Sequence, residues 1–193
     1  MPLTIVQAGE PVLRKPARAL RPNEIRSREI RELIAQMKET MYAAPGVGLA
    51  APQIGQGIQL AVIEDRPEYI KDWTPAQLAE RERGSVPFHV IINPKITPIG
   101  DEQVEYFEGC LSLTNLMALV PRARKVRVEC ADEKGEPKVI EASGWYARIL
   151  QHEIDHLGGT MYVDHMRPRT LMTVENFTAY WKDKTMADIR AVL

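Results

Sequence analysis

Two histidines four positions apart, His152 and His156, are the residues of this sequence best suited to chemistry. In a helix, side chains at this spacing project from one face, where both imidazoles can bind a single metal ion. Glu153 follows the first histidine, and its carboxylate can take a proton from water bound to the metal without being a ligand. The simpler alternative is an amphipathic helix that carries two histidines by chance. Gly158 and Gly159, just past the second histidine, favour the metal site because they predict a helix end there.

A catalytic metal with two histidine ligands needs a third protein ligand, because such sites usually keep three ligands and one position for water. Cys110 is the best candidate, since Gly109 beside it permits close approach of the backbone and a metal stabilises a thiolate. The alternative is that Cys110 is a small buried apolar residue. Cys130 lies in an alternating apolar pattern that is typical of a buried strand. Two cysteines do not form a disulfide framework.

Residues 46–55, with the sequence GVGLAAPQIG, form a run of small residues in which Gln53 has the only hydrogen-bonding side chain. Such a run lets an extended peptide approach the backbone and pair with it as an added strand. The Gln53 amide can donate to a developing oxyanion, as neutral amides do in acyl-transfer sites. A tight loop after a helix is the alternative interpretation.

The elements that must position these residues follow from periodicity and from glycine and proline. Apolar residues at spacings of three and four predict a helix over 24–43, capped by Asn23 or Ser27. Strands are predicted at 59–64, 89–94, 103–107, 118–120, 124–131 and 137–142, a helix at 144–157 and a closing helix at 171–181. This order predicts an α+β fold, with antiparallel or mixed sheets packed around a central metal-binding helix and with N-terminal and C-terminal helices.

The length and charge of the chain set limits on its organisation and partners. Its 193 residues fit one domain, 1–193, in which the charged and proline-containing stretch 65–87 is expected to be an exposed insert. The net charge of −1 provides no positive field for direct nucleic-acid binding. No apolar stretch predicts membrane insertion. The first residues do not resemble a targeting segment, so the expected location is the cytoplasm.

Three segments in order, GVGLAAPQIG at 46–55, EGCLS at 108–112 and QHEIDHLGG at 151–159, resemble the signature motifs of the peptide deformylases. The likeness extends over most of the chain, including 10–14, 119–122 and 142–145. It implies a metallohydrolase that removes the formyl group from the N-formylmethionine of newly synthesised peptides and releases formate. The segment 142–145 is similar to the organellar branch, although the N-terminus favours a bacterial cytoplasmic enzyme.

The resemblance also implies a role for each matching residue. The ligands of one divalent metal ion would be Cys110, His152 and His156, with Glu153 as general base and later proton donor. The oxyanion would be held by the Gln53 side chain and the backbone N–H of Leu111. Val47, Gly48 and Gly109 would line the peptide groove, and Trp145 and Ile149 would shape the methionine pocket. The family implies Fe²⁺, with Zn²⁺, Ni²⁺ or Co²⁺ as substitutes, whereas a His₂Cys set alone suggests zinc.

Residues 113–115 and Met117 differ from the family pattern where the substrate is expected to lie.

Two other functions are consistent with part of the pattern. A zinc endopeptidase of the His-Glu-x-x-His type would not need Cys110. A non-catalytic, metal-stabilised peptide-binding module would not need Glu153. The C-terminal tail is mixed in charge, so transient contact with the ribosome is a hypothesis only.

Overall fold

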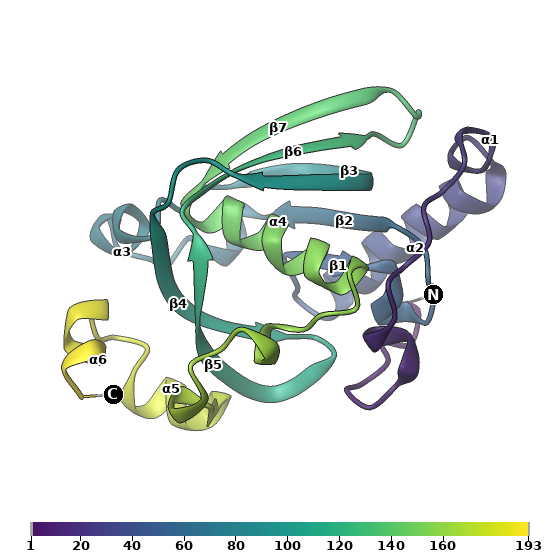
Figure 1. Ribbon diagram of the computed structural model, residues 1–193. Coiled ribbons are helices and arrows are strands. Elements are labelled where there is room, and N and C mark those ends of the chain that lie inside the picture. The colour runs from purple at the N-terminus through teal and green to yellow at the C-terminus, as the bar shows by residue number, and fades with distance from the viewer. Residues whose placement is uncertain (1, 193) are drawn as a thin grey trace.

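Two antiparallel β-sheets enclose the long helix α4 (Gly144–Leu157) in the computed structural model, which describes residues 2–192 (Figure 1). The five-stranded sheet has the order β1-β2-β3-β6-β7, formed by Gly48–Ala50, Leu60–Asp65, Val86–Pro98, Lys125–Ala131 and Pro137–Ser143. The three-stranded sheet has the order β4-β5-β8, formed by Gln103–Cys110, Leu113–Ala123 and Met172–Thr173. The predicted α+β class, with its central helix, is confirmed.

The middle of the five-stranded sheet is covered by a helix on each face. In β2, Leu60 and Val62 pack into the cluster that includes the apolar stripe of α2 (Arg28–Ala43). Ala61 and Ile63, which point the other way, join the cluster that contains the buried side chains of α4. A strand that is buried on both faces consists almost entirely of apolar residues, which explains the sequence LAVI at 60–63.

The N-terminal helix is split where the sequence predicted one continuous helix over 24–43. The structure has a short helix α1 (Pro22–Ile25) and then α2, which begins after Ser27. The Ser27 side chain accepts a hydrogen bond from the backbone N–H of Ile30, so Ser27 caps α2, while Asn23, the other predicted cap, lies within α1.

The C-terminal segment differs from the single closing helix predicted over 171–181. It contains β8, then α5 (Val174–Tyr180) and α6 (Met186–Val192). Met172 pairs with Met117 of β5, and the Thr173 side chain then caps α5. The predicted helix was correct for α5, but the first residues of the predicted range, Met172 and Thr173, pair with β5 as a strand. The strands β1 and β8 were not predicted, because two or three residues are too few to show a period.

The insert, residues 65–87, contacts the start of α4, where the backbone N–H of Trp145 donates to the carbonyl of Arg81. It contains α3 (Pro75–Glu80) and a 3₁₀ turn at Pro67–Tyr69, and most of its residues are exposed or half-buried. Asp65 is fully buried, however, and forms an ion pair with Arg83. Within residues 2–192, no helix is long and apolar enough to cross a membrane.

Candidate functional site

Cys110, His152 and His156 converge where β4 meets α4. Their potential ligand atoms all lie within 4.8 Å of one another. The Cys110 Sγ lies 3.2 Å from the Nε2 of His156. Two imidazoles and a thiolate this close together can bind one divalent ion. The four-residue spacing on α4 therefore places both histidines as the sequence predicted, and Cys110 is the third residue beside them.

Glu108, for which the sequence predicted no role, fixes the orientation of His152. The Nδ1 of His152 lies 2.9 Å from the Glu108 carboxylate, which leaves Nε2 as the nitrogen that can ligate. Arg122 donates two hydrogen bonds to the same carboxylate, at 2.9 and 3.0 Å, and Arg148 donates another. All three partners of Glu108 are largely buried, and Arg122 also pairs with Asp155 of α4.

A buried network of this kind was difficult to predict because its members are far apart in sequence. Arg148 is 2% exposed and lies between the buried Ala147 and Ile149, in the apolar stretch of α4. A charge in an apolar helix stretch was the available signal, because buried charges must be paired. The sequence could not indicate that its partner is Glu108, 40 positions earlier.

The pKa values of the two histidines are shifted in opposite directions. Burial alone would lower the pKa of His152, but hydrogen bonds to Cys110 and Glu108 outweigh burial and raise this pKa well above its ordinary value. Burial, followed by the positive charges of His152 and Arg122, lowers the pKa of His156 well below its ordinary value. The surroundings of His152 therefore favour positive charge, as those of a cation-binding site should, whereas burial disfavours charge on His156.

Glu153 is 3% exposed and faces the site from α4. Burial raises the pKa of its carboxyl group to about 7. Its Oε2 has no hydrogen-bond partner among residues 2–192, so it is available to a small molecule in the site. A β-carbon on Gly48 would lie 2.2 Å from the Glu153 Oε1. The absence of a side chain at Gly48 is therefore what leaves room for this carboxylate.

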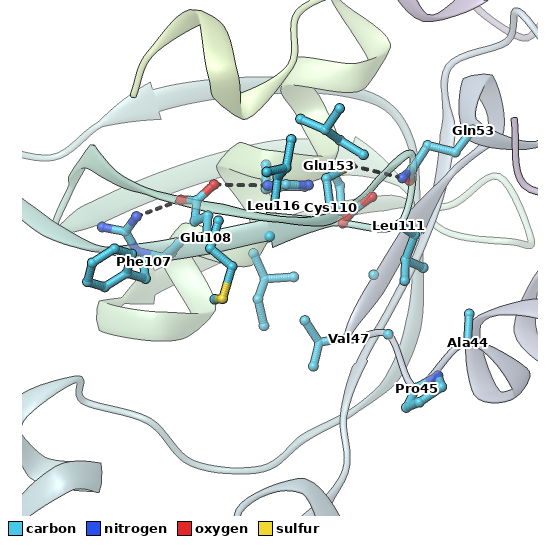
Figure 2. Close-up of a pocket in the computed structure, with 18 of the residues that line it drawn as sticks. Ala44, Pro45, Val47, Gln53, Phe107, Glu108, Cys110, Leu111, Leu116 and Glu153 are labelled. Atoms are coloured by element: carbon cyan, nitrogen blue, oxygen red, sulfur yellow. Dashed lines mark hydrogen bonds and ion pairs between the residues drawn. The ribbon is translucent and has the colours of Figure 1, made fainter. Parts of the chain in front are cut away.

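Gln53 presents its amide to the same site. Its Oε1 accepts a hydrogen bond of 2.8 Å from the Ala50 backbone N–H, which orients the amide. Its Nε2 then faces the Cys110 Sγ at 3.5 Å and the Ser112 Oγ at 3.4 Å. Figure 2 shows Gln53, Cys110 and Glu153 at one end of the pocket. The arrangement places a fixed amide donor beside the candidate metal ligands.

The pocket next to these residues, called the site pocket, has a volume of about 530 Å³. All the residues predicted to bind substrate line it, namely Val47, Gly48, Gly109, Trp145 and Ile149, and Leu111 does so as well. Asn115 and Met117, which the sequence analysis expected to lie near the substrate, also line it. His156 is fully buried and does not. The strands β1 and β4, at whose ends the pocket opens, are each the outermost strand of a sheet, so their backbones can accept an extended peptide.

Comparisons with known proteins agree with this arrangement. The sequence profile of the family described as Polypeptide deformylase matches residues 2–171. The chloroplastic peptide deformylase 1A of Solanum lycopersicum is 49% identical over 176 residues, which are 89% of this chain and 62% of that protein. Peptide deformylase 1 of Bifidobacterium longum is 45% identical over 179 residues, 93% of this chain and 79% of that protein. The chain spans less than two thirds of the length of the plant relatives in tomato and Arabidopsis thaliana.

Solved structures share the fold. A class I type b peptide deformylase from Acinetobacter baumannii, crystallised with Met-Ala-Ser, superposes with a TM-score of 0.76 at 31% identity. That match covers 86% of this chain and 99% of the other. The enzyme from Synechococcus elongatus, in complex with actinonin, gives a TM-score of 0.71 at 39% identity and covers 86% of this chain and 79% of the other. From profile, sequence and fold alike, this chain belongs to the polypeptide deformylase family.

Proposed function

We propose that this protein is a peptide deformylase, which hydrolyses the formamide C–N bond of N-formylmethionyl peptides to formate and a free amine. The observation that supports this most directly is the convergence of Cys110, His152 and His156 with Glu153 and Gln53 at one end of an apolar pocket. A zinc endopeptidase or a non-catalytic binding module does not require all five.

Cys110, His152 and His156 would hold one divalent metal ion, which we propose to be Fe²⁺ as in the family. A bound metal supplies Lewis acidity, which lowers the pKa of water and polarises the formyl oxygen. If anaerobically purified protein contained only zinc and lost no activity in air, iron would not be the native metal, because oxidation should inactivate an iron–thiolate centre.

Glu153 accepts the proton of the attacking water and later delivers it to the departing amine nitrogen. Its buried carboxyl group, with a pKa raised to about 7 by burial, suits both directions of transfer near neutral pH. The oxyanion that forms at the formyl carbon receives hydrogen bonds from the Gln53 amide and the backbone N–H of Leu111. The amide is pre-oriented by its hydrogen bond to Ala50, so little reorganisation is needed.

The peptide binds in extended form along β1 and β4, with Val47, Gly48 and Gly109 beside its backbone. The methionine side chain enters the apolar part of the site pocket between Trp145 and Ile149. The Acinetobacter enzyme crystallised with Met-Ala-Ser, a peptide that begins with methionine, supports this choice of substrate.

We also propose that residues 1–193 act as a single catalytic domain, because both sheets contribute to one pocket. We propose the cytoplasm as its location, in keeping with the bacterial relative that is 45% identical. The plant relatives, named as chloroplastic and mitochondrial, make an organelle the alternative compartment. Transient contact with the ribosome follows from the proposed substrate, and failure to co-sediment with ribosomes at low salt would argue against it.

The decisive experiment is release of formate from formyl-Met-Ala-Ser by anaerobically prepared protein. Glu153→Ala should retain metal and fold but lose nearly all turnover, by about 10²–10⁴-fold for loss of a general base. Cys110→Ser separates the rival functions, because a deformylase should lose or exchange its metal. Cleavage of internal peptide bonds without release of formate would identify an endopeptidase, and metal binding without either reaction would identify a binding module.

A further inference from the structure

A second cavity, also of about 530 Å³, lies beyond the site pocket. It is bounded by the insert, by β4 and by the C-terminal helices α5 and α6. Phe107, Met117 and Trp145 line both cavities, so these three side chains form the wall between them. Trp145 has the largest side chain of the three, and it is also the residue expected at the methionine pocket.

Residues of the insert hold Trp145 in place. The indole Nε1 is buried and has no hydrogen-bond partner among residues 2–192, so contacts with its ring must set its orientation. The guanidinium carbon of Arg83 lies 4.9 Å from the centroid of this ring. The backbone N–H of Trp145 donates to the carbonyl of Arg81 at 2.9 Å. Both the ring and the backbone of Trp145 therefore contact the insert.

Arg83 is itself rigidly positioned. It donates two hydrogen bonds to Asp65, at 2.7 and 2.9 Å, and Asp65 is fully buried while the Arg83 side chain is 8% exposed. The same guanidinium lies 4.8 Å from the centroid of Trp73. A planar guanidinium that is paired with a carboxylate on its edge presents a flat face to aromatic rings. Trp73 and Trp145 thus both contact a cation that cannot move freely.

We propose that the insert limits the depth of the site pocket by holding Trp145, through Arg83, as a partition in front of the second cavity. The inference rests on the proposed function, in which the first side chain of the substrate enters this pocket. Methionine then ends at the partition, and a longer side chain must displace Trp145 to enter the second cavity. Trp145 is the specificity determinant, and Arg83 is the residue that positions it.

The test compares kcat/KM for formyl-Met-Ala-Ser with kcat/KM for the same peptide carrying 2-aminodecanoic acid first. Trp145→Leu joins the two cavities, and each additional buried methylene should raise kcat/KM for the long side chain about fourfold. We expect the ratio of long to methionine substrate to rise at least about tenfold in this variant. The ratio does not depend on the fraction of folded or metal-loaded protein, and Trp145→Phe provides a milder variant with a smaller rise.

Trp181→Leu is the matched control, because Trp181 lines only the second cavity. Its ratio should stay within about twofold of wild type. Arg83→Lys retains a positive charge opposite Asp65 but loses the planar guanidinium that lies over the Trp145 ring. It should raise the ratio about threefold, by lowering KM for the long peptide. The partition is overturned if the ratio is unchanged in both Trp145 variants, or if Trp181→Leu raises the ratio as much as Trp145→Leu does. The role of the insert is overturned if the ratio is unchanged in Arg83→Lys.

If the protein is not a deformylase, the wild-type protein releases no formate from the methionine peptide. In that case calorimetry with the unformylated peptides, Met-Ala-Ser and its 2-aminodecanoyl counterpart, tests the partition without turnover. Tighter binding of the long peptide to Trp145→Leu than to wild type supports the partition, and equal binding overturns it.

Discussion

Glu108 is the residue on which the geometry of the candidate metal ligands depends. Its carboxylate accepts hydrogen bonds from His152, Arg122 and Arg148, so one anion orients a candidate ligand and forms ion pairs with two buried cations. Sequence spacing alone predicted the pair of histidines, because a helix brings residues four apart to one face. It could not predict which carboxylate orients them, because that contact joins β4 to α4 across 44 positions.

Replacing Glu108 with Gln should lower metal affinity by about 10–100-fold, the usual cost of losing a group that orients a metal ligand. It should also cost about 3–5 kcal/mol of folding stability, because Arg148 would remain buried without its carboxylate. Metal titration and urea unfolding measure the two effects. Glu105→Gln, on the same strand and paired with the exposed Arg167, is the control and should change neither. Normal metal affinity in Glu108→Gln would contradict this role.

Gly48→Ala should reduce turnover by about 10²-fold while leaving metal content unchanged. The added carbon would lie 2.2 Å from Glu153 Oε1, so the carboxylate must shift, and small displacements of a catalytic group have effects of this size. The assay is release of formate together with metal analysis. Gly57→Ala adds the same carbon where nothing lies within 4 Å and should keep wild-type activity. Equal activity in both variants would mean that Glu153 does not act from its observed position.

Helix α4 was predicted with approximate bounds that agree with the structure, whereas the C-terminal segment was predicted as a single helix, and local sequence signals explain the difference. Gly158 marks the end of α4, and the apolar residues of this helix repeat at helical spacing. The segment after Leu171 begins as a strand, because Met172 pairs with β5, a contact made across 55 positions. Local periodicity cannot report such pairing, so β8 was missed. The separate helix α6 was not predicted either.

Helix α2 offers a direct test of local sequence effects on stability. Ser27→Ala removes the side chain that accepts from the Ile30 N–H, and it should lower the free energy of unfolding by about 1 kcal/mol. Ser27→Asn restores an acceptor and should stay within a few tenths of a kcal/mol of wild type. Urea denaturation of the two variants measures both values. If Ser27→Ala and Ser27→Asn lowered the free energy of unfolding equally, the cap hydrogen bond would contribute little to stability.

The candidate site lies where the two sheets meet. Cys110 belongs to β4 of the three-stranded sheet, while His152 and His156 belong to α4, which packs on the five-stranded sheet (Figure 1). The fold class was predicted from the sequence because it needs only the order and type of the elements. Cys110 was proposed as the third ligand because two histidines need one more and a cysteine beside a glycine is suited to it, and the family resemblance implied the same set. No local pattern connects residue 110 with residue 152.

A metal bound by these three residues would link the two sheets and should stabilise the whole fold. At a free concentration of about 100 times its Kd, a ligand adds roughly 2.7 kcal/mol to the native state. For a chain of this length that corresponds to a rise in Tm of roughly 5–10 °C. We expect Ni²⁺ to produce this rise in chelator-treated wild-type protein, measured by calorimetry. Cys130 is not one of the three candidate ligands, so Cys130→Ser should show the same rise in Tm, whereas Cys110→Ser should lose most of it. An equal rise in both cysteine variants would mean that the metal binds elsewhere and does not join β4 to α4.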